Sequence, residues 1–420
     1  MENQLPNWIA YHNDELYLDK FKARDLVEEF ETPLMVYSQN RLKQNAISIQ
    51  NAFSNCDPRS MIYYAYKACY YKEVTNTFAE NNIGAEVMSP MEYQLAINSG
   101  FVGNKIIVNG LGKTEPEITQ ALQNDVFLIN VDSMDDLILV NKIASKIHKK
   151  VNIGVRVYPS ITDSHFSRTP GKLGLHIKSG DAKRVILAAK KMPFVSLVAL
   201  HVHTYSLQTN PTLHQKVAES VAEFASQLAQ QEDIYFKYID IGGGLNSRYL
   251  IERSGWNIKD FAKNLVPIVS SIAGNPTAIV EPGTFLVNDA AVVLTKVICE
   301  KINNGKRWLV VDAGVNVLNP SPFAYYEIHP ALREEHDNDH FGIVDGLCSP
   351  VSIQKKAILP RTITKGSILA ILNCGGYTLS SARSWGYPLF PVVFTTKDKA
   401  KLLVTKERVL KLQNMMHGII

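Results

Sequence analysis

Through the middle of the chain, short apolar runs rich in β-branched and aromatic residues alternate with segments of helical periodicity. Eight such runs can be counted: Ile62–Tyr66, Ile83–Val87, Ile106–Val108, Val126–Val131, Val151–Val157, Leu197–Val202, Tyr238–Ile241 and Ala278–Val280. Runs of this length, bounded by turn residues, are typical of buried strands. Because eight strands alternate with helices, we predict an α/β fold with a closed parallel (β/α)8 TIM-like barrel rather than an open sheet.

Two of the intervening segments carry clear helix signals. Ser89 and Pro90 stand directly before the segment Met91–Ile97, and this pair is typical of a helix cap and first turn. The segment Pro211–Gln231 carries apolar residues at helical spacing, among them Val217. We therefore predict helices over 91–97 and 211–231, between consecutive strands of the barrel.

The pattern changes from Phe285 onward, where β-branched runs follow one another without regular helices. These runs are Ala291–Val297, Trp308–Asp312, Ser367–Leu372, Val392–Thr395 and Ala400–Val404. They predict a separate, mostly-β domain over residues 285–420, joined by residues 1–38, while the barrel covers residues 39–284. Trp8–Tyr17 and Leu34–Ser38 are expected to add strands to the β domain. The charged run His329–His340 is interpreted as a solvated loop in preference to a metal site.

The net charge, hydropathy and cysteine spacing of the chain argue against several classes of protein. The net charge of +4 over 420 residues is too small for a nucleic-acid footprint. No apolar run approaches the roughly 18 residues that a membrane helix needs, and the start of the chain lacks the pattern of a secretory signal. The five cysteines are scattered, which disfavours a disulfide framework or a zinc site. We expect a cytoplasmic protein with no bound metal and no nucleic-acid or membrane partner.

Lys67 follows the first predicted barrel strand. A lysine at the carboxyl end of a barrel strand points to the face where active sites of this fold lie. Its apolar flanks would desolvate the ammonium and lower its pKa, as a Schiff-base lysine requires. The alternative is a surface lysine whose alkyl stem covers apolar neighbours, and Lys67 taken alone favours that alternative.

Two further features follow the last two barrel strands. Gly242, Gly243 and Gly244 come after the seventh strand, where barrels place phosphate sites. Glu281 ends the eighth strand, and a carboxylate there could keep the pyridine nitrogen of pyridoxal phosphate (PLP) protonated, making the ring an electron sink. Flexible turns are the alternative for both features.

Polar residues also end the fifth and sixth strands. His201 and His203 lie on one side of the sixth strand, which allows a paired-histidine metal site. We favour a ring-stacking role for His203 and a phosphate-binding hydroxyl from Ser206. Arg156 lies within an apolar strand and needs an anionic partner, either a structural carboxylate or a cofactor. These residues, with Lys67 and Glu281, fall at the same ends of different strands, which indicates one site.

With these residues identified, the chain resembles the fold-type III PLP decarboxylases, the alanine-racemase-like barrels that include the diaminopimelate and ornithine decarboxylases. The resemblance covers nearly the whole chain. Four segments resemble the family's cofactor-lysine, HxHxxS, glycine-loop and EPG motifs: Tyr64–Ala68, His201–Ser206, Gly242–Gly244 and Glu281–Gly283. The resemblance implies that PLP is carried on Lys67 and contacted by His203 and Gly283. Arg156 is also predicted to contact the cofactor, from its place at the same end of the barrel.

The resemblance also implies roles outside the barrel. Cys348 is similar to the family's active-site cysteine, which is reached from the partner subunit of a homodimer with active sites at the interface. Tyr377, in Gly375–Tyr377, is similar to a tyrosine that contacts the cofactor phosphate. Lys67, His203 and Cys348 are thus the expected catalytic residues, acting on a small amino-acid-derived substrate.

Two departures bear on the substrate. The family's EPGR continues with Thr284 here, and its CESGD reads Cys348 followed by Ser349 and Pro350, without the acidic groups that meet a distal ammonium. The segment Leu347–Pro350 is closer to the LCTP pattern of a branch that acts on larger amino-acid conjugates. Our leading prediction is therefore decarboxylation of an N-citryl-diamino acid, such as N-citryl-ornithine, in siderophore biosynthesis.

Four alternatives stay open at this stage. The first is diaminopimelate decarboxylation in lysine biosynthesis. The second is amino-acid racemisation on the same cofactor, which Glu281 disfavours because the racemases of this fold have an arginine there. The third is a non-catalytic PLP-binding protein, which the extra β domain and Cys348 disfavour. The fourth is a metal-dependent barrel enzyme that uses His201 and His203.

Overall fold

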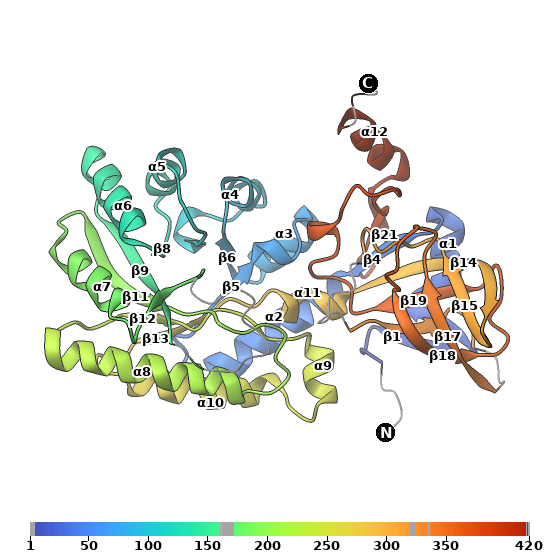
Figure 1. Ribbon diagram of the computed structural model, residues 1–420, viewed down its shortest axis with the longest axis horizontal. Helices are drawn as coiled ribbons and strands as arrows, with labels where there is room; N and C mark the ends of the chain where they lie inside the picture. The colour runs from blue at the N-terminus through green and yellow to red at the C-terminus, as the bar shows by residue number, and fades with distance from the viewer. Residues whose placement is uncertain are drawn as a thin grey trace. The chain divides into compact units, whose positions relative to one another are not determined.

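The computed structural model describes residues 5–159, 161, 172–318, 325–333, 337–416 and 418. The chain divides into two compact units (Figure 1). One, the barrel unit, is Asn45–Leu286, and the other, the β unit, combines Met1–Gln44 with Val287–Ile420. The first boundary falls inside helix α2 (Gln39–Ser54).

Parallel strands close into a barrel in the barrel unit. In chain order they are β5 (Met61–Ala65), β6 (Gly84–Val87), β7 (Ile106–Val108), β8 (Leu128–Val131), β9 (Val151–Tyr158), β11 (Val195–His201), β12 (Tyr238–Asp240) and β13 (Thr277–Val280). Each pairs with the next, and β13 closes the ring by pairing with β5. The barrel prediction is confirmed, and every predicted strand is present in the described residues. A two-residue strand, β10 (Leu175–His176), was not predicted and pairs with β9.

Helices surround the barrel strands (Figure 1). They are α3 (Lys72–Glu80), α4 (Pro90–Asn98), α5 (Glu115–Gln123), α6 (Met134–Lys146), α7 (Asp181–Lys191), α8 (Thr212–Glu232), α9 (Arg248–Arg253) and α10 (Ile258–Ser271). The short helix α11 (Thr284–Val287) follows β13, where the barrel unit ends. The predicted cap of α4 is present, because Ser89 Oγ accepts the Glu92 N–H at 3.2 Å. The predicted helix 211–231 is α8 within one residue at each end.

The barrel interior contains a layer of apolar side chains from different strands. Its fully buried members are Tyr63, Ile107, Leu128, Val198, Ala199 and Ile279. Burying a large apolar side chain contributes about 1.5–3 kcal/mol. This layer therefore holds the strands in register and fixes the polar residues at their carboxyl ends.

The β unit is built around one branched sheet. Its strands are β4 (Leu34–Ser38), β14 (Ala291–Asn303), β15 (Lys306–Val311), β16 (Glu327–Pro330), β17 (Asn338–Val344), β18 (Gln354–Pro360), β19 (Ile368–Leu372), β20 (Val392–Thr395) and β21 (Ala400–Val404). The long strand β14 pairs antiparallel with β4, β15 and β19. Two helices accompany the sheet, α1 (Ala23–Phe30) and α12 (Lys406–Met416).

The prediction for the N-terminal segments is confirmed, because Trp8–Tyr17 and Leu34–Ser38 both contribute strands to the β unit. Leu34–Ser38 is β4 of the branched sheet, whereas Trp8–Tyr17 forms β1 (Ile9–His12) and β2 (Glu15–Leu18), which with β3 (Phe21–Lys22) make a separate sheet. The apolar side chains of this small sheet pack into the same core as those of β14 and β19. An apolar face can be buried by packing against another sheet without strand pairing. Strands β16, β17 and β18 were not predicted.

The charged run His329–His340 is not a continuous loop. His329 lies buried in β16, with its Nε2 at 3.1 Å from Glu327 Oε1, and His340 lies in β17. His336 falls outside the described residues. Pairing in the sheet and the neighbouring carboxylate explain how a histidine in so polar a run is buried. Across the ranges that the structure describes, no helix has both the length and the apolar content to cross a membrane.

Candidate active site

Lys67 lies in a short 3-10 turn, Tyr66–Ala68, directly after β5. The turn is fixed beside the end of β13, because the Ala65 N–H donates to the Pro282 carbonyl at 3.1 Å. The Lys67 ammonium pairs with Glu86 Oε2 from β6, and its side chain is 27% exposed, whereas that of Glu86 is 1% exposed. A primary amine thus stands at the carboxyl end of the barrel beside a buried carboxylate.

A buried amide connects this carboxylate to a second one. Asn109, which follows β7, donates from Nδ2 to Glu86 Oε1 and to Glu281 Oε1, both at 2.9 Å. Its own Oδ1 accepts from Asn130 Nδ2 at 2.8 Å. Side chains from β6 and β8 and from the residues that follow β7 and β13 therefore form one hydrogen-bonded chain.

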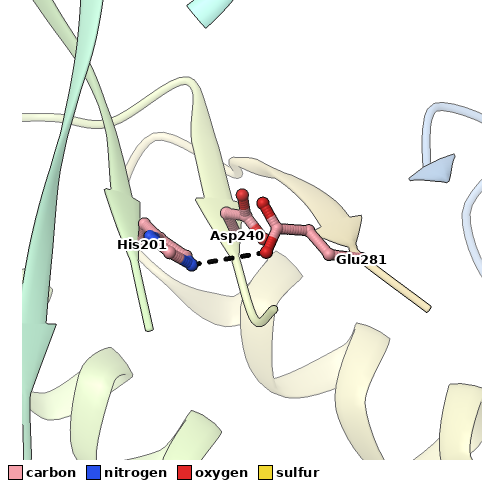
Figure 2. Close-up of side chains that lie close together, drawn as sticks. All are labelled: His201, Asp240 and Glu281. Carbon is pink, nitrogen blue, oxygen red and sulfur yellow. Dashed lines mark ion pairs between the residues drawn. The ribbon is translucent and has the colours of Figure 1, made fainter. Parts of the chain in front are cut away.

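Glu281 also lies in a compact group with His201 and Asp240 (Figure 2). His201 Nε2 is 3.5 Å from Glu281 Oε2, and one ligand atom from each residue lies within 4.8 Å of the others. Sequence reasoning had paired His201 with His203 and found no acidic neighbour. The barrel instead brings His201 to two carboxyl groups, because β11, β12 and β13 are adjacent.

One of the two carboxyl groups is protonated and the other is ionised. Burial and the negative charge of Glu281 raise the pKa of Asp240 well above its usual range. Burial would also raise the pKa of Glu281, but His201, Lys67 and a hydrogen bond with Asp240 together hold it below its usual range. Glu281 is therefore the ionised member of the pair, and Asp240 keeps its proton.

His203 follows the end of β11, and its ring is neutral. Burial, with the positive charges of Arg156 and Lys67, lowers the pKa of His203 to about 3. Its Nδ1 accepts the Gly243 N–H at 3.2 Å. The imidazole is therefore held in one orientation without a positive charge.

The pH dependence of stability follows from the pKa of His203. Because this pKa is lower in the folded chain than in the unfolded one, the unfolded chain takes up the proton first as the pH falls below about 6.5. We expect the wild-type apoprotein to lose more stability between about pH 7 and about pH 5 than His203→Gln, which binds no proton. Urea unfolding at both pH values measures the difference, and equal losses would contradict the assignment.

Arg156 in β9 has a carboxylate partner within the barrel unit. Its Nε lies 3.8 Å from Asp132 Oδ2, and its Nη2 donates to the His203 carbonyl at 3.5 Å. Burial raises the pKa of Asp132, and Arg156 offsets part of that rise. Arg156 therefore forms an ion pair with a structural carboxylate, one of the two partners predicted from the sequence. Its contact with a cofactor stays a prediction.

The glycine loop after β12 needs residues without a Cβ atom. Gly242 and Gly244 have φ of +70° and +90°, and a Cβ on Gly243 would lie 2.2 Å from the Glu281 carbonyl. The Gly242 N–H donates to Asp240 Oδ1 at 2.9 Å, and that of Gly243 is directed at His203. The loop therefore fastens the ends of β11, β12 and β13 together, a role that the sequence did not indicate.

The remaining predicted residues lie in different places. Ser206 is exposed in the segment after β11, and Gly283 begins the turn into α11. Cys348 and Tyr377 belong to the β unit, where the cysteine is exposed and the tyrosine is 41% exposed. The barrel unit thus brings together Lys67, Arg156, His203, the glycine loop and Glu281.

Sequence reasoning missed several residues of this site, chiefly Glu86, Asn109, Asn130 and Asp240. Glu86 stands within the apolar run Ile83–Val87, and Asp240 stands between two isoleucines. A charged residue inside a buried strand needs a partner, which is the signal that identified Arg156 and could have identified these two. Asn109 precedes a glycine and has the pattern of a turn, so no sequence signal separates it from loop asparagines.

The family can now be stated from comparison with known proteins. The family model described as "Pyridoxal-dependent decarboxylase, pyridoxal binding domain" matches residues 40–288. The chain belongs to the pyridoxal-dependent decarboxylases. Its cofactor is PLP, and it is a PLP-dependent carboxy-lyase. Metal-dependent and non-catalytic alternatives are thereby set aside.

Relatives of this pyridoxal-dependent decarboxylase match over almost its whole length. The diaminopimelate decarboxylase of Aquifex aeolicus is 28% identical over 406 residues, which cover 95% of each chain. The solved structure of diaminopimelate decarboxylase from M. jannaschii has a TM-score of 0.89 at 27% identity, covering 96% of this chain and 97% of that one. The Helicobacter pylori enzyme complexed with L-lysine has a TM-score of 0.83 at 28% identity, covering 94% and 100%.

The residues of the barrel unit fit the cofactor. Lys67 supplies the primary amine, and Glu281 supplies a buried carboxylate that its neighbours keep ionised. His203 supplies a neutral ring, and the glycine loop leaves no room for side chains beside it. This set of groups matches an aldehyde, a pyridine nitrogen and an aromatic face better than it matches a metal ion.

Proposed function

We propose that this protein is a diaminopimelate decarboxylase. PLP-dependent amino-acid decarboxylation follows from the family, and the substrate is the further step. Relatives named diaminopimelate decarboxylase, at 27–28% identity, match more than nine-tenths of both chains, and this similarity carries the proposal. It favours the second sequence interpretation over the leading one, the N-citryl conjugate of siderophore biosynthesis, which these relatives do not support.

Three residues of the barrel unit would do the chemical work. Lys67 would attach the cofactor and later accept or return a proton at its Nζ. Glu281, held ionised in the barrel, would keep the pyridine nitrogen protonated, and His203 would cover one face of the ring. When bound, PLP supplies the electron sink for the bond to the departing carboxylate.

Other assignments rest on the resemblance. Gly242–Gly244, Ser206, Gly283 and Tyr377 are expected to bind the cofactor phosphate region, and Arg156 is expected to contact the cofactor. Cys348 of the partner subunit is expected to lie near the reacting carbon, in a homodimer. These assignments stay predictions.

Glu281 separates decarboxylation from racemisation. An anion at the pyridine nitrogen favours full delocalisation of the negative charge that develops when carboxylate leaves. The racemases resembled in this fold have an arginine there, which weakens that delocalisation. An ionised Glu281 beside a protonated Asp240 therefore supports decarboxylation.

Two departures from the family pattern favour a second candidate, a larger amino-acid conjugate. Thr284, the first residue of α11, is 8% exposed and stands where the family pattern has an arginine. Ser349 and Pro350 replace the acidic residues after Cys348. A substrate whose distal end is not a bare amino-acid group would suit these changes.

A substrate panel tests the two candidates. We expect the kcat/KM of the holoenzyme for CO2 release from diaminopimelate to exceed that for ornithine, lysine or N-citryl-ornithine by at least about a hundredfold. A site built to bind a polar group of its substrate strongly rejects analogues that lack this group. Lysine should appear in equal amount with CO2. Release of CO2 from N-citryl-ornithine alone would overturn the proposal in favour of the conjugate, and chiral analysis of unreacted substrate checks for racemisation.

A further inference from the structure

Asn109 lies between the carboxylates of Glu86 and Glu281, and each of these carboxylates also contacts another residue. One oxygen of Glu86 pairs with Lys67, and one oxygen of Glu281 faces His201. The other oxygen of each accepts from the same Asn109 Nδ2, at 2.9 Å in both cases. An asparagine amide has two N–H groups, and here each is used by a different carboxylate.

Two further hydrogen bonds fix the orientation of the Asn109 amide. Asn109 Oδ1 accepts from Asn130 Nδ2 at 2.8 Å, and the Asn109 backbone N–H donates to the Val87 carbonyl at 2.7 Å. A reversed amide would turn its oxygen toward two carboxylate oxygens and its nitrogen toward the Asn130 nitrogen. Asn109 is 6% exposed and Asn130 is 2% exposed, so water cannot easily replace these bonds.

We propose that Asn109 is a positioning residue that clamps Glu86 and Glu281. Glu86 thereby keeps its second oxygen on Lys67, and Glu281 keeps its second oxygen toward His201, with the carboxylate in place for the pyridine nitrogen. The inference rests on the proposed roles of Lys67 and Glu281. Because the Asn109 amide is neutral, it holds the two carboxylates close together in a buried site without adding a positive charge. A lysine or arginine there would neutralise the carboxylates on which both ends of the cofactor depend.

Asn109→Asp is the sharpest test. The aspartate has the same shape and still accepts from Asn130, but it offers no N–H to Glu86 or Glu281 and brings a further carboxyl group. We expect PLP to bind about tenfold to a hundredfold more weakly, the loss that follows removal of a hydrogen bond to a charged group. The pH at which the visible absorption of the lysine-bound cofactor changes form is expected to move upward by about one unit, because an added anion favours the protonated form.

Asn45→Asp is the matched control. Asn45 is a fully buried asparagine of the same unit, but its Nδ2 donates to the Leu286 carbonyl at 3.2 Å and to neither carboxylate. Because the contact that is lost is the one to the Leu286 carbonyl, this variant is expected to lose stability while retaining the wild-type transition pH. The same shift in both variants would overturn the proposal, since it would then reflect general destabilisation.

Three readouts separate the outcomes. Apoprotein unfolding reports on the fold, equilibrium titration with PLP gives affinity, and absorption against pH gives the transition. If the wild type binds PLP and releases CO2 but Asn109→Asp matches it in affinity and transition pH, the inference is wrong while the proposed function stands. If Asn109→Asp does not fold, Asn109→Ser, which is too short to bridge both carboxylates, is expected to weaken PLP binding by about tenfold, and wild-type affinity would overturn the inference.

Discussion

Lys67→Ala is expected to abolish the absorption band of the lysine-bound cofactor and to lower CO2 release by at least about 10³-fold, the scale on which loss of a covalent catalytic group acts. Lys67 is the primary amine that the barrel presents next to Glu86 and the Glu281 group. Without it, the cofactor has no covalent attachment in this site. The measurements are the spectrum of protein saturated with PLP and single-turnover CO2 release.

Lys67→Arg serves as the matched control for charge. Arginine keeps a cation beside Glu86, so the buried carboxylate retains a partner, but a guanidinium does not form the covalent bond to an aldehyde. We expect this variant to fold better than Lys67→Ala and to lack the band equally. Near-wild-type turnover in either variant would show that Lys67 does not carry the cofactor.

The second large effect is expected from Glu281→Gln, which preserves shape and removes the buried negative charge. Because the charge acts where the ring nitrogen would lie, kcat is expected to fall by about 10²- to 10³-fold, the scale of losing one preorganised electrostatic contact. The lost charge is also expected to lower the pKa of Asp240 partway toward its usual range, because burial, the larger cause of its rise, stays while the contribution of Glu281 is lost. Steady-state kinetics and the pH profile of kcat measure both consequences.

Asp136→Asn controls for the loss of a buried carboxylate as such. Asp136 is 4% exposed in the barrel unit. It pairs with Lys113 and accepts the Asp132 N–H, both at 3.4 Å, and these contacts do not involve Lys67, His203 or Glu281. We expect it to reduce stability and to leave kcat within about threefold of wild type, because the reacting groups are untouched. A fall in kcat equal to that of Glu281→Gln would contradict the role given to Glu281.

The barrel could be predicted from the sequence because each strand is a short apolar run between turn residues. Lys67 and Glu281 could be placed at the same edge because parallel strands carry their carboxyl ends together. In the β unit the same reasoning failed for β16, β17 and β18. Charged residues lie within these strands, and a proline ends both β16 and β18, so no run of apolar or alternating residues marks them in the sequence.

The interior of the site was less predictable for a related reason. Asn109 and Glu281 are 172 positions apart, yet their side chains are joined by a hydrogen bond. Local patterns report whether a residue lies in a strand, and they do not report which polar side chains meet inside the barrel. Glu86 and Asp240 gave a usable signal as charges in apolar strands, whereas Asn109 gave none.

Peptide mapping after borohydride reduction tests the central claim most directly, because reduction fixes the bond between an aldehyde cofactor and its lysine. Purified protein supplied with PLP would be reduced, digested and analysed by mass spectrometry. The account predicts one pyridoxyl-modified peptide, the one that contains Lys67. Modification at another lysine, or no modification in protein that releases CO2 from an amino acid, would contradict it.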